Sequence, residues 1–226
     1  MLGVQRAVPA IRCRAVLFDL DGVLVDSTEC VERTWRRWAL AHGLDPARVI
    51  TVAHGRRTTE TIEIVAPHLP AAEEGAALAL SESTTTDGIY EVAGARELVA
   101  GLPPTAWAVV TSGIRAVASL RIRHAKLPWP PVLICADEIE RGKPDPEGYL
   151  TAAQRLGHLP GDCIVIEDAP AGIAAARAAG MRAVAIASTH AADSLAAADV
   201  IVHSLAALSI SPSNDDGVLE IGVAVA

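Results

Sequence analysis

Six short segments of the chain are almost continuously apolar and rich in β-branched residues. They span residues 15–20, 106–112, 132–135, 163–168, 182–187 and 199–202. Strands that are buried on both faces of a sheet have this continuous pattern, whereas strands with one exposed face alternate apolar and polar positions. The pattern therefore predicts a mostly parallel sheet that is covered on both sides.

Segments with helical periodicity lie between these strands, at residues 114–126, 146–157 and 170–180. The last of them begins with Pro170 and ends with Gly180, which are common first and last residues of a helix. Regular alternation of strands and helices is typical of a doubly wound α/β domain. We therefore predict the class α/β, with a doubly wound, mostly parallel sheet.

One interval, residues 28–92, interrupts the alternation. It contains no convincing strand, and residues 28–43, 58–69 and 71–83 have helical patterns. An insertion of about 65 residues is much longer than an ordinary connection between a strand and a helix. We predict an inserted all-helical domain at 28–92 and a core formed by 1–27 and 93–226, with linkers near 26–28 and 89–94. The segment 211–226 could be a final edge strand or a loose tail.

Composition narrows the class of partner and the compartment. The formal net charge of −8 argues against a nucleic-acid partner, and no apolar run reaches the ~18 residues that a membrane span needs. Arg6 and Pro9 interrupt the apolar core that a secretion signal would need. The cysteines are widely scattered, which favours free thiols in a reducing cytoplasm over disulfides. They are Cys13, Cys30, Cys135 and Cys163.

Polar residues follow four of the predicted strands, at the edge of the sheet where α/β domains carry their active sites. In chain order they are Asp19 and Asp21, then Thr111, Ser112 and Gly113, then Lys143, and finally Glu167 and Asp168. A single polar residue at a strand end is commonly a helix cap or a turn. The convergence of so many on one edge is much harder to explain without a shared function.

The residue types at this edge suit phosphate chemistry. In an extended strand Asp19 and Asp21 would point to the same side, and two like charges held close together require a cation nearby. Carboxylate oxygens from two strand ends are ligands that suit Mg²⁺. Lys143 offers a positive charge to a phosphoryl group, and the Thr-Ser-Gly segment before a helix offers hydrogen-bond donors.

Four sequence segments in this order, "DLDGVLVDS", "VVTSG", "GKPDPEGY" and "VIEDAPAGI", resemble the four motifs of the haloacid dehalogenase superfamily. The resemblance extends from about residue 14 to residue 207. It implies an aspartyl-phosphate mechanism on a Rossmann-like core with an all-helical cap domain inserted after the first strand. Within the superfamily, "HGRRTTETIEIVAPHLP" (54–70) is similar to the cap segment of glycerol-phosphate and 2-deoxyglucose-6-phosphate phosphatases.

The resemblance also assigns expected roles. Asp19 would be the nucleophile, and Asp21 would be the general acid and then the general base. Mg²⁺ would be held by the Asp19 carboxylate, the Asp21 backbone carbonyl and Asp168, with Glu167 in support. Expected substrate contacts are Thr111, Ser112, Gly113, Lys143 and, from the cap, Arg57. For Arg57 a solvated position at a helix start remains equally open, and for Trp35 and Trp38 core packing is favoured over substrate stacking.

These features predict a Mg²⁺-dependent phosphoric monoester hydrolase that acts on a small phosphorylated sugar or polyol. It would work in the cytoplasm as a monomer or homodimer, without nucleic acid or a membrane. Sugar phosphomutases share the four motifs, but they carry a histidine at the position that matches Val31. A catalytically silent binding module is the remaining alternative. Such modules typically lack the nucleophile or a metal carboxylate, and here neither is missing.

Overall fold

The structure, a computed structural model, describes residues 10–213 and 217–224. A six-stranded sheet runs through the core in the order β6–β5–β2–β7–β8–β9, and every neighbouring pair is parallel. The strands are β2 (Ala15–Phe18), β5 (Trp107–Val110), β6 (Leu133–Ile134), β7 (Cys163–Glu167), β8 (Arg182–Ile186) and β9 (Val200–Val202). Each lies in a segment that the apolar pattern predicts to be a strand. The predicted fold class is confirmed.

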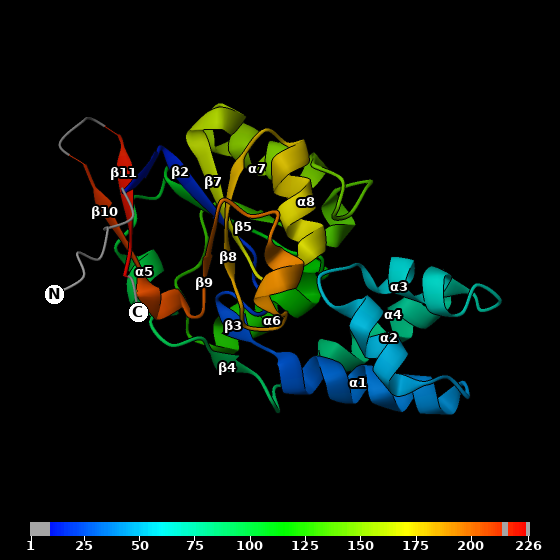
Figure 1. The fold of residues 1–226 in the computed structure, drawn as a ribbon. Coiled ribbons are helices and arrows are strands. Elements are labelled where there is room, and N and C mark those ends of the chain that lie inside the picture. Colours follow the sequence, from blue (N-terminus) through cyan, green and yellow to red (C-terminus); the bar gives the residue numbers. More distant parts are fainter. Residues whose placement is uncertain (1–9, 214–216, 225–226) are drawn as a thin grey trace, which may run out of the picture.

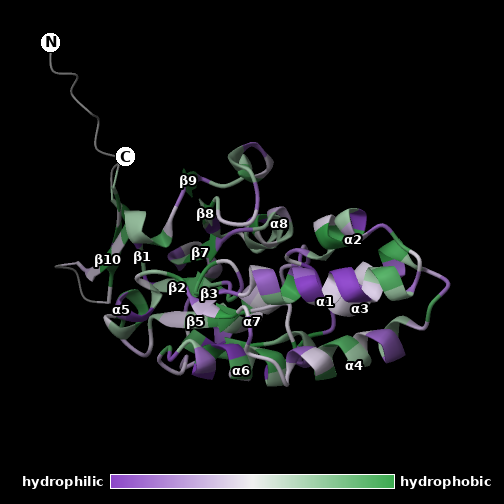
Figure 2. Ribbon diagram, turned by 90° about the horizontal axis from the view of Figure 1, so that it is seen from below, coloured by the Kyte–Doolittle hydropathy of each residue, from purple (hydrophilic) through white to green (hydrophobic). Residues whose placement is uncertain are grey.

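Helices cover both faces of this sheet (Figure 1). The covering helices are α5 (Ala95–Ala100), α6 (Arg115–His124), α7 (Glu147–Leu156) and α8 (Pro170–Ala178). Because successive strand residues point to opposite faces, Val16 and Phe18 of β2 pack with α5 and α6. Ala15 and Leu17 pack on the other side with α7 and α8. The strands are accordingly apolar at almost every position, whereas α6 combines hydrophilic and hydrophobic residues (Figure 2). Short 3-10 helices occur at Ala136–Glu138, Pro160–Asp162, Ala192–Leu195 and Leu205–Ala207.

A second, antiparallel sheet lies at the end of the core far from the helices of residues 28–82 (Figure 1). It has the order β1–β11–β10, formed by β1 (Ile11–Cys13), β10 (Leu208–Pro212) and β11 (Leu219–Val223). Of the segment 211–226, residues 211–212 end β10, an edge strand of this sheet, and residues 219–223 form β11, its middle strand. Residues 214–216 and 225–226 of that segment lie outside the described residues.

The insertion forms four helices: α1 (Thr28–Ala41), α2 (Pro46–Ala53), α3 (Thr58–Val65) and α4 (Ala71–Glu82). They enclose a separate apolar cluster in which Trp35 and Trp38 are both buried, with ring centroids 5.4 Å apart and planes at 85°. The predicted core packing of these two rings is therefore confirmed. This cluster gives the inserted helical cap domain a core of its own.

The two linkers of the cap lie side by side. β3 (Val25–Asp26) precedes the cap and β4 (Tyr90–Glu91) follows it, and the two pair as an antiparallel ribbon. The sequence analysis predicted no strand in this interval, and for residues 90–91 that prediction was wrong. The precise limits 28–92 for the cap remain a prediction. None of the helices in the described ranges is both long and apolar enough to cross a membrane.

Candidate active site

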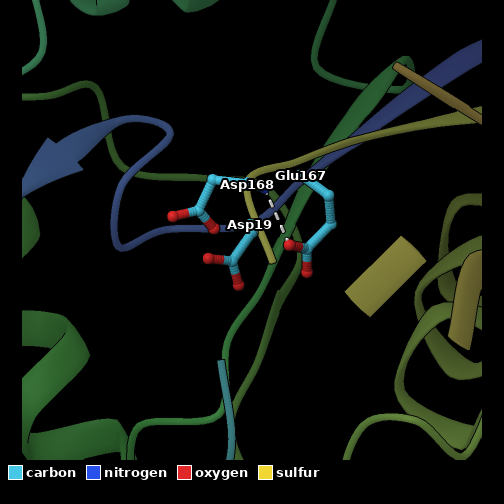
Figure 3. Close-up of side chains that lie close together, drawn as sticks. All are labelled: Asp19, Glu167 and Asp168. Carbon is cyan, nitrogen blue, oxygen red and sulfur yellow. Dashed lines mark hydrogen bonds between the residues drawn. The ribbon is translucent and has the colours of Figure 1, made fainter. Parts of the chain in front are cut away.

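Three buried carboxylates meet at the carboxyl edge of the main sheet. Asp19 directly follows β2, and its backbone N–H donates to the Ile166 carbonyl at 2.9 Å. Glu167 ends β7 and Asp168 follows it. Each of the three carboxyl groups has an oxygen within 4.8 Å of an oxygen of the other two, and each residue is at most 6% exposed. Figure 3 shows the three side chains converging on one point.

Lys143 is the cation of this cluster. It is 5% exposed, and its ammonium group donates to Asp19 Oδ1, to Glu167 Oε1 at 2.6 Å and to the Val110 carbonyl at 3.2 Å. One lysine faces three carboxylates, so the buried cluster has an excess of negative charge when all of its members are ionised. Buried charges need partners. The cluster therefore favours a further cation.

Glu167 is fully engaged within the protein. Its Oε1 accepts from Lys143 and from the Tyr149 hydroxyl at 2.9 Å. Its Oε2 accepts from the backbone N–H groups of Asp168 at 2.9 Å and Ala169 at 3.0 Å, and the first of these bonds joins two of the residues drawn in Figure 3. A carboxylate offers about four lone-pair positions, and all four are used here. Glu167 thus holds Lys143 in place. Asp19 and Asp168 each accept one side-chain hydrogen bond, from Lys143 and from the Thr189 hydroxyl, and keep further lone pairs with which they could hold a metal ion.

Burial changes the acidity of the cluster. It raises the pKa of Asp19 to about 7, assisted by the charges of Glu167 and Asp21 and opposed by Lys143. Burial also raises the pKa of Asp168, with Glu167 and Asp19 adding to the effect. The raised pKa values mean that ionising these carboxyl groups is unfavourable when no further cation is nearby. The donors are all hard oxygens, which Mg²⁺ and Ca²⁺ prefer.

Two glycines allow backbone to approach these carboxylates closely. Gly22 has φ +80°, and a Cβ there would lie 2.0 Å from Asp168 Oδ2. A Cβ on Gly172 of α8 would lie 1.6 Å from Glu167 Oε1. Any side chain at either position would displace a carboxylate of the cluster.

Gly172→Ala should destabilise the protein by about 1–3 kcal/mol or more, because the buried Glu167 has no free space into which it could retreat. Gly161→Ala is the matched control, since a Cβ at Gly161 has no heavy atom within 4 Å. Urea unfolding of both variants measures the difference. Equal stability of the two variants would show that the contact between α8 and Glu167 is loose.

Asp21 is held by two donors beside this cluster. Its Oδ1 accepts from the Ser27 hydroxyl at 2.6 Å and from Arg121 Nη1 at 2.7 Å. Arg121 belongs to α6, and its side chain is 4% exposed. Sequence reasoning missed Ser27 and Arg121. Arg121 follows the buried Val117 and Ala118 at helical spacing, so an arginine on the apolar face of a helix was the available signal.

The Thr-Ser-Gly segment lies at the end of β5 and faces the cap. The Gly113 N–H donates to Thr111 Oγ1 at 3.0 Å, and the Ser112 hydroxyl donates to the Gly55 carbonyl of the cap at 3.0 Å. Thr111, Ser112 and Gly113 all line the same cleft as Asp19 and Asp21. The structure therefore gathers the predicted core residues at one site.

The cleft lies between the cap and the core. Its cap wall includes Val31, Trp35, His54 and Arg56.

Arg57 lies beside the cleft, where it lines a smaller pocket together with Ser112 and Lys143, and its predicted contact with substrate stays a prediction. Its guanidinium donates to the carbonyls of Ile139 and Glu140, both at 2.9 Å, and Arg57 is not among the residues that line the cleft. Its side chain is 14% exposed, so it is not the solvated arginine of the alternative interpretation either. We therefore propose Arg57 as a contact that fixes the cap to the core. Arg56 is the cap arginine at the cleft.

A sequence model of the haloacid dehalogenase-like hydrolases matches residues 13–180. The chain belongs to this family. It is 39% identical to hexitol phosphatase A of Escherichia coli over 91% of this chain and 98% of that protein. It is 31% identical to 2-deoxyglucose-6-phosphate phosphatase 2 of Saccharomyces cerevisiae over 94% of this chain and 96% of that protein.

A solved haloacid dehalogenase-like hydrolase from Bacteroides fragilis has the same fold, with a TM-score of 0.73. The match covers 85% of this chain and 98% of that one, at 22% identity. The predicted resemblance to the haloacid dehalogenase family is thus confirmed. In this chain the cleft lies at the carboxyl edge of the main sheet.

Proposed function

We propose that this haloacid dehalogenase-like protein is a Mg²⁺-dependent phosphatase that hydrolyses a small phosphorylated sugar or polyol. The observation that carries the proposal is the position of Asp19. It lies buried between Lys143 and Asp168, in a cleft that Asp21 also lines. A carboxylate nucleophile beside a second, independently held carboxylate is the arrangement that phosphoryl transfer through an aspartyl phosphate requires.

The reaction has two steps. In the first, a carboxylate oxygen of Asp19 attacks phosphorus, the bond between phosphorus and the leaving oxygen breaks, and protonated Asp21 gives its proton to that oxygen. In the second, ionised Asp21 takes a proton from water, and the water oxygen attacks phosphorus. The bond between phosphorus and the Asp19 oxygen breaks, which releases the Asp19 carboxylate and inorganic phosphate. Such acid–base assistance typically contributes about 10²–10⁴-fold to the rate. Ser27 and Arg121 would orient Asp21 in both steps.

The phosphoryl group needs positive charge and hydrogen-bond donors around it. Lys143 supplies a charge that its buried contacts with Asp19 and Glu167 fix in place. The hydroxyl groups of Thr111 and Ser112 would supply donors at the wall of the cleft, that of Ser112 after it releases the Gly55 carbonyl. We assign Mg²⁺ to the oxygens of Asp19, Asp168 and the Asp21 carbonyl, where it would supply the charge that the cluster lacks.

The substrate class rests on the relatives and on the cleft. Their names specify phosphatases of hexitols and of 2-deoxyglucose 6-phosphate, and the chain matches nearly their whole length. The cleft combines polar groups with the apolar Val31 and Trp35, which suits a small polyhydroxylated group. The described cysteines are all free and buried, which supports the cytoplasm as the compartment that we propose.

A sugar phosphomutase is the second candidate, and Val31 argues against it. This residue of α1 lines the cleft, where a mutase of the family would carry a histidine. A valine has no proton to exchange and no hydrogen bond to offer. The intact set of carboxylates argues equally against a silent binding module.

The function is tested by phosphorus NMR of the purified protein with Mg²⁺. We expect one free phosphate for each molecule of hexitol 6-phosphate or glycerol 1-phosphate consumed. Glucose 1-phosphate and glucose 6-phosphate should not interconvert. Appearance of the other glucose phosphate isomer without matching free phosphate would overturn the hydrolase assignment in favour of a mutase.

A further inference from the structure

A buried ion network joins the cap to the residue that handles the leaving group. Arg121 of the core contacts Asp21 through Nη1 at 2.7 Å and Glu82 through Nη2 at 3.2 Å. Glu82 is the last residue of α4, so it comes from the cap. The side chains of Arg121 and Glu82 are 4% and 13% exposed, and both residues line the cleft.

The network has unused hydrogen-bonding capacity. Arg121 Nε is buried and has no hydrogen-bond partner within the described ranges. Glu82 is bound through Oε2, and among the described residues no donor reaches its Oε1. A buried donor that lacks a partner has a free-energy cost of about 1–3 kcal/mol, so the protein alone does not satisfy this network completely.

We propose that Glu82 and Arg121 form the subsite for the leaving group and select a neutral, hydroxyl-bearing group over one that carries a carboxylate. The proposal rests on the phosphatase function above and specifies its substrate class. The position of this subsite follows from Asp21. The Asp21 side chain must reach the leaving oxygen, and Arg121 contacts Asp21. The pair therefore lies next to the first carbons of the leaving group.

The charges of the subsite fit a hydroxyl. A hydroxyl both donates and accepts, so it can donate to the Glu82 carboxylate and accept from the Arg121 guanidinium at once. A carboxylate can only accept. It would face the negative charges of Glu82 and Asp21 and compete with both for one guanidinium that they already share.

Arg56 does not cancel this preference. It is the other arginine in the cleft wall, and it directly follows Gly55, whose carbonyl accepts from the Ser112 hydroxyl. Its backbone is thus at the phosphoryl end of the cleft. The leaving-group end keeps two carboxylates and one guanidinium.

Two esters that differ in one group test the proposal: 2-hydroxyethyl phosphate carries CH₂OH where phosphoglycolate carries a carboxylate. For the wild-type protein we expect kcat/KM to be at least about tenfold higher for 2-hydroxyethyl phosphate, since loss of a matched hydrogen bond in a binding site has at least this effect. Glu82→Gln should lower this ratio by about tenfold or more. The amide can still accept from Arg121, and it can donate to a carboxylate.

Glu73→Gln is the matched control, because Glu73 lies on the same helix, α4, and is exposed. It should leave the ratio unchanged. A variant that merely loosens the cap would slow both esters equally, and that result for Glu82→Gln would overturn the proposal. Thermal unfolding verifies that Glu82→Gln is folded. If Glu82→Gln is unfolded, the test is the ratio of the two kcat/KM values of the wild-type protein. A ratio of about one or less would overturn the subsite.

A third ester, p-nitrophenyl phosphate, tests the phosphatase function separately from the subsite. Its leaving group carries no further hydroxyl that the subsite could bind. Turnover of this ester without discrimination between the two test esters would refute the subsite and leave the phosphatase function standing. No phosphate release from any of the three esters with Mg²⁺ would refute the phosphatase function and the subsite with it.

Discussion

Asp19→Asn should lower the turnover of every phosphate ester by about 10³-fold or more. The amide keeps the shape of the side chain but cannot attack phosphorus, and loss of a covalent nucleophile typically costs several orders of magnitude. The loss should appear in kcat for substrates of any size, because phosphoryl transfer to Asp19 is common to all of them. Phosphate release under saturating substrate measures it.

The same variant should remain folded. Burial raises the pKa of Asp19 to about 7 from an ordinary value of 3.8, so above pH 3.8 the unfolded chain releases this proton more readily than the folded chain does. Stability is therefore lost progressively as the pH rises from about 4 to 7. Removing the charge relieves that loss, and Asp19→Asn should unfold in metal-free buffer at no lower temperature than the wild type at pH 7. Asp193→Asn, at an exposed position, is the control.

Retention of more than about a tenth of the activity by Asp19→Asn would exclude the aspartyl-phosphate route.

Removal of divalent cations should abolish activity, and Mg²⁺ should restore it. The buried carboxylates of Asp19, Glu167 and Asp168 have one lysine among them, so a phosphate dianion would meet net negative charge without a metal ion. Ca²⁺ should bind and support little turnover, because its longer and more variable coordination misaligns nucleophile and phosphorus. The measurement is phosphate release after chelation and after return of each ion. Full activity in metal-free buffer would contradict the assigned site.

Binding can be followed without turnover. A ligand present at 100 times its dissociation constant stabilises the folded state by about 2.7 kcal/mol, so Mg²⁺ should raise the unfolding temperature of the wild-type protein. Asp168→Asn should lose most of this shift, because it removes a charged ligand at the point where the carboxylates converge. Asp193→Asn should keep it. An equal shift in both variants would place the ion elsewhere.

The core of this fold could be predicted from the sequence because its signals are local. Residues 163–166 of β7, for example, are all apolar, as expected for a strand in a sheet that is covered on both faces. The catalytic residues follow these strands directly, so locating the strands also located Asp19, Asp168 and the Thr-Ser-Gly segment. The helices of the cap were harder to predict. Residues 46–53 include Val49, Ile50 and Thr51, whose branched side chains disfavour helix, and packing against the rest of the cap overrides this preference.

Contacts between distant segments could not be predicted. Arg57 and Arg56 are neighbours with the same chemistry, and only the docking of the cap decides that one binds the carbonyls of residues 139 and 140 while the other faces the cleft. The network of Asp21, Arg121 and Glu82 likewise joins three elements that the chain separates widely. The small antiparallel sheet pairs residues 11–13 with 219–221, and no local pattern identifies such partners.

The ribbon of β3 and β4 means that the cap enters and leaves the core at a single point, since Val25 pairs with Glu91 and Asp26 with Tyr90. A segment whose two ends are adjacent can be exchanged as a unit, much as a domain is inserted into a surface loop, without moving the sheet that it interrupts. Descendants of such a protein can acquire a new substrate by remodelling one contiguous stretch of gene, while nucleophile, lysine and metal carboxylates are inherited unchanged. Modular replacement of this stretch is also the natural route for engineering its specificity.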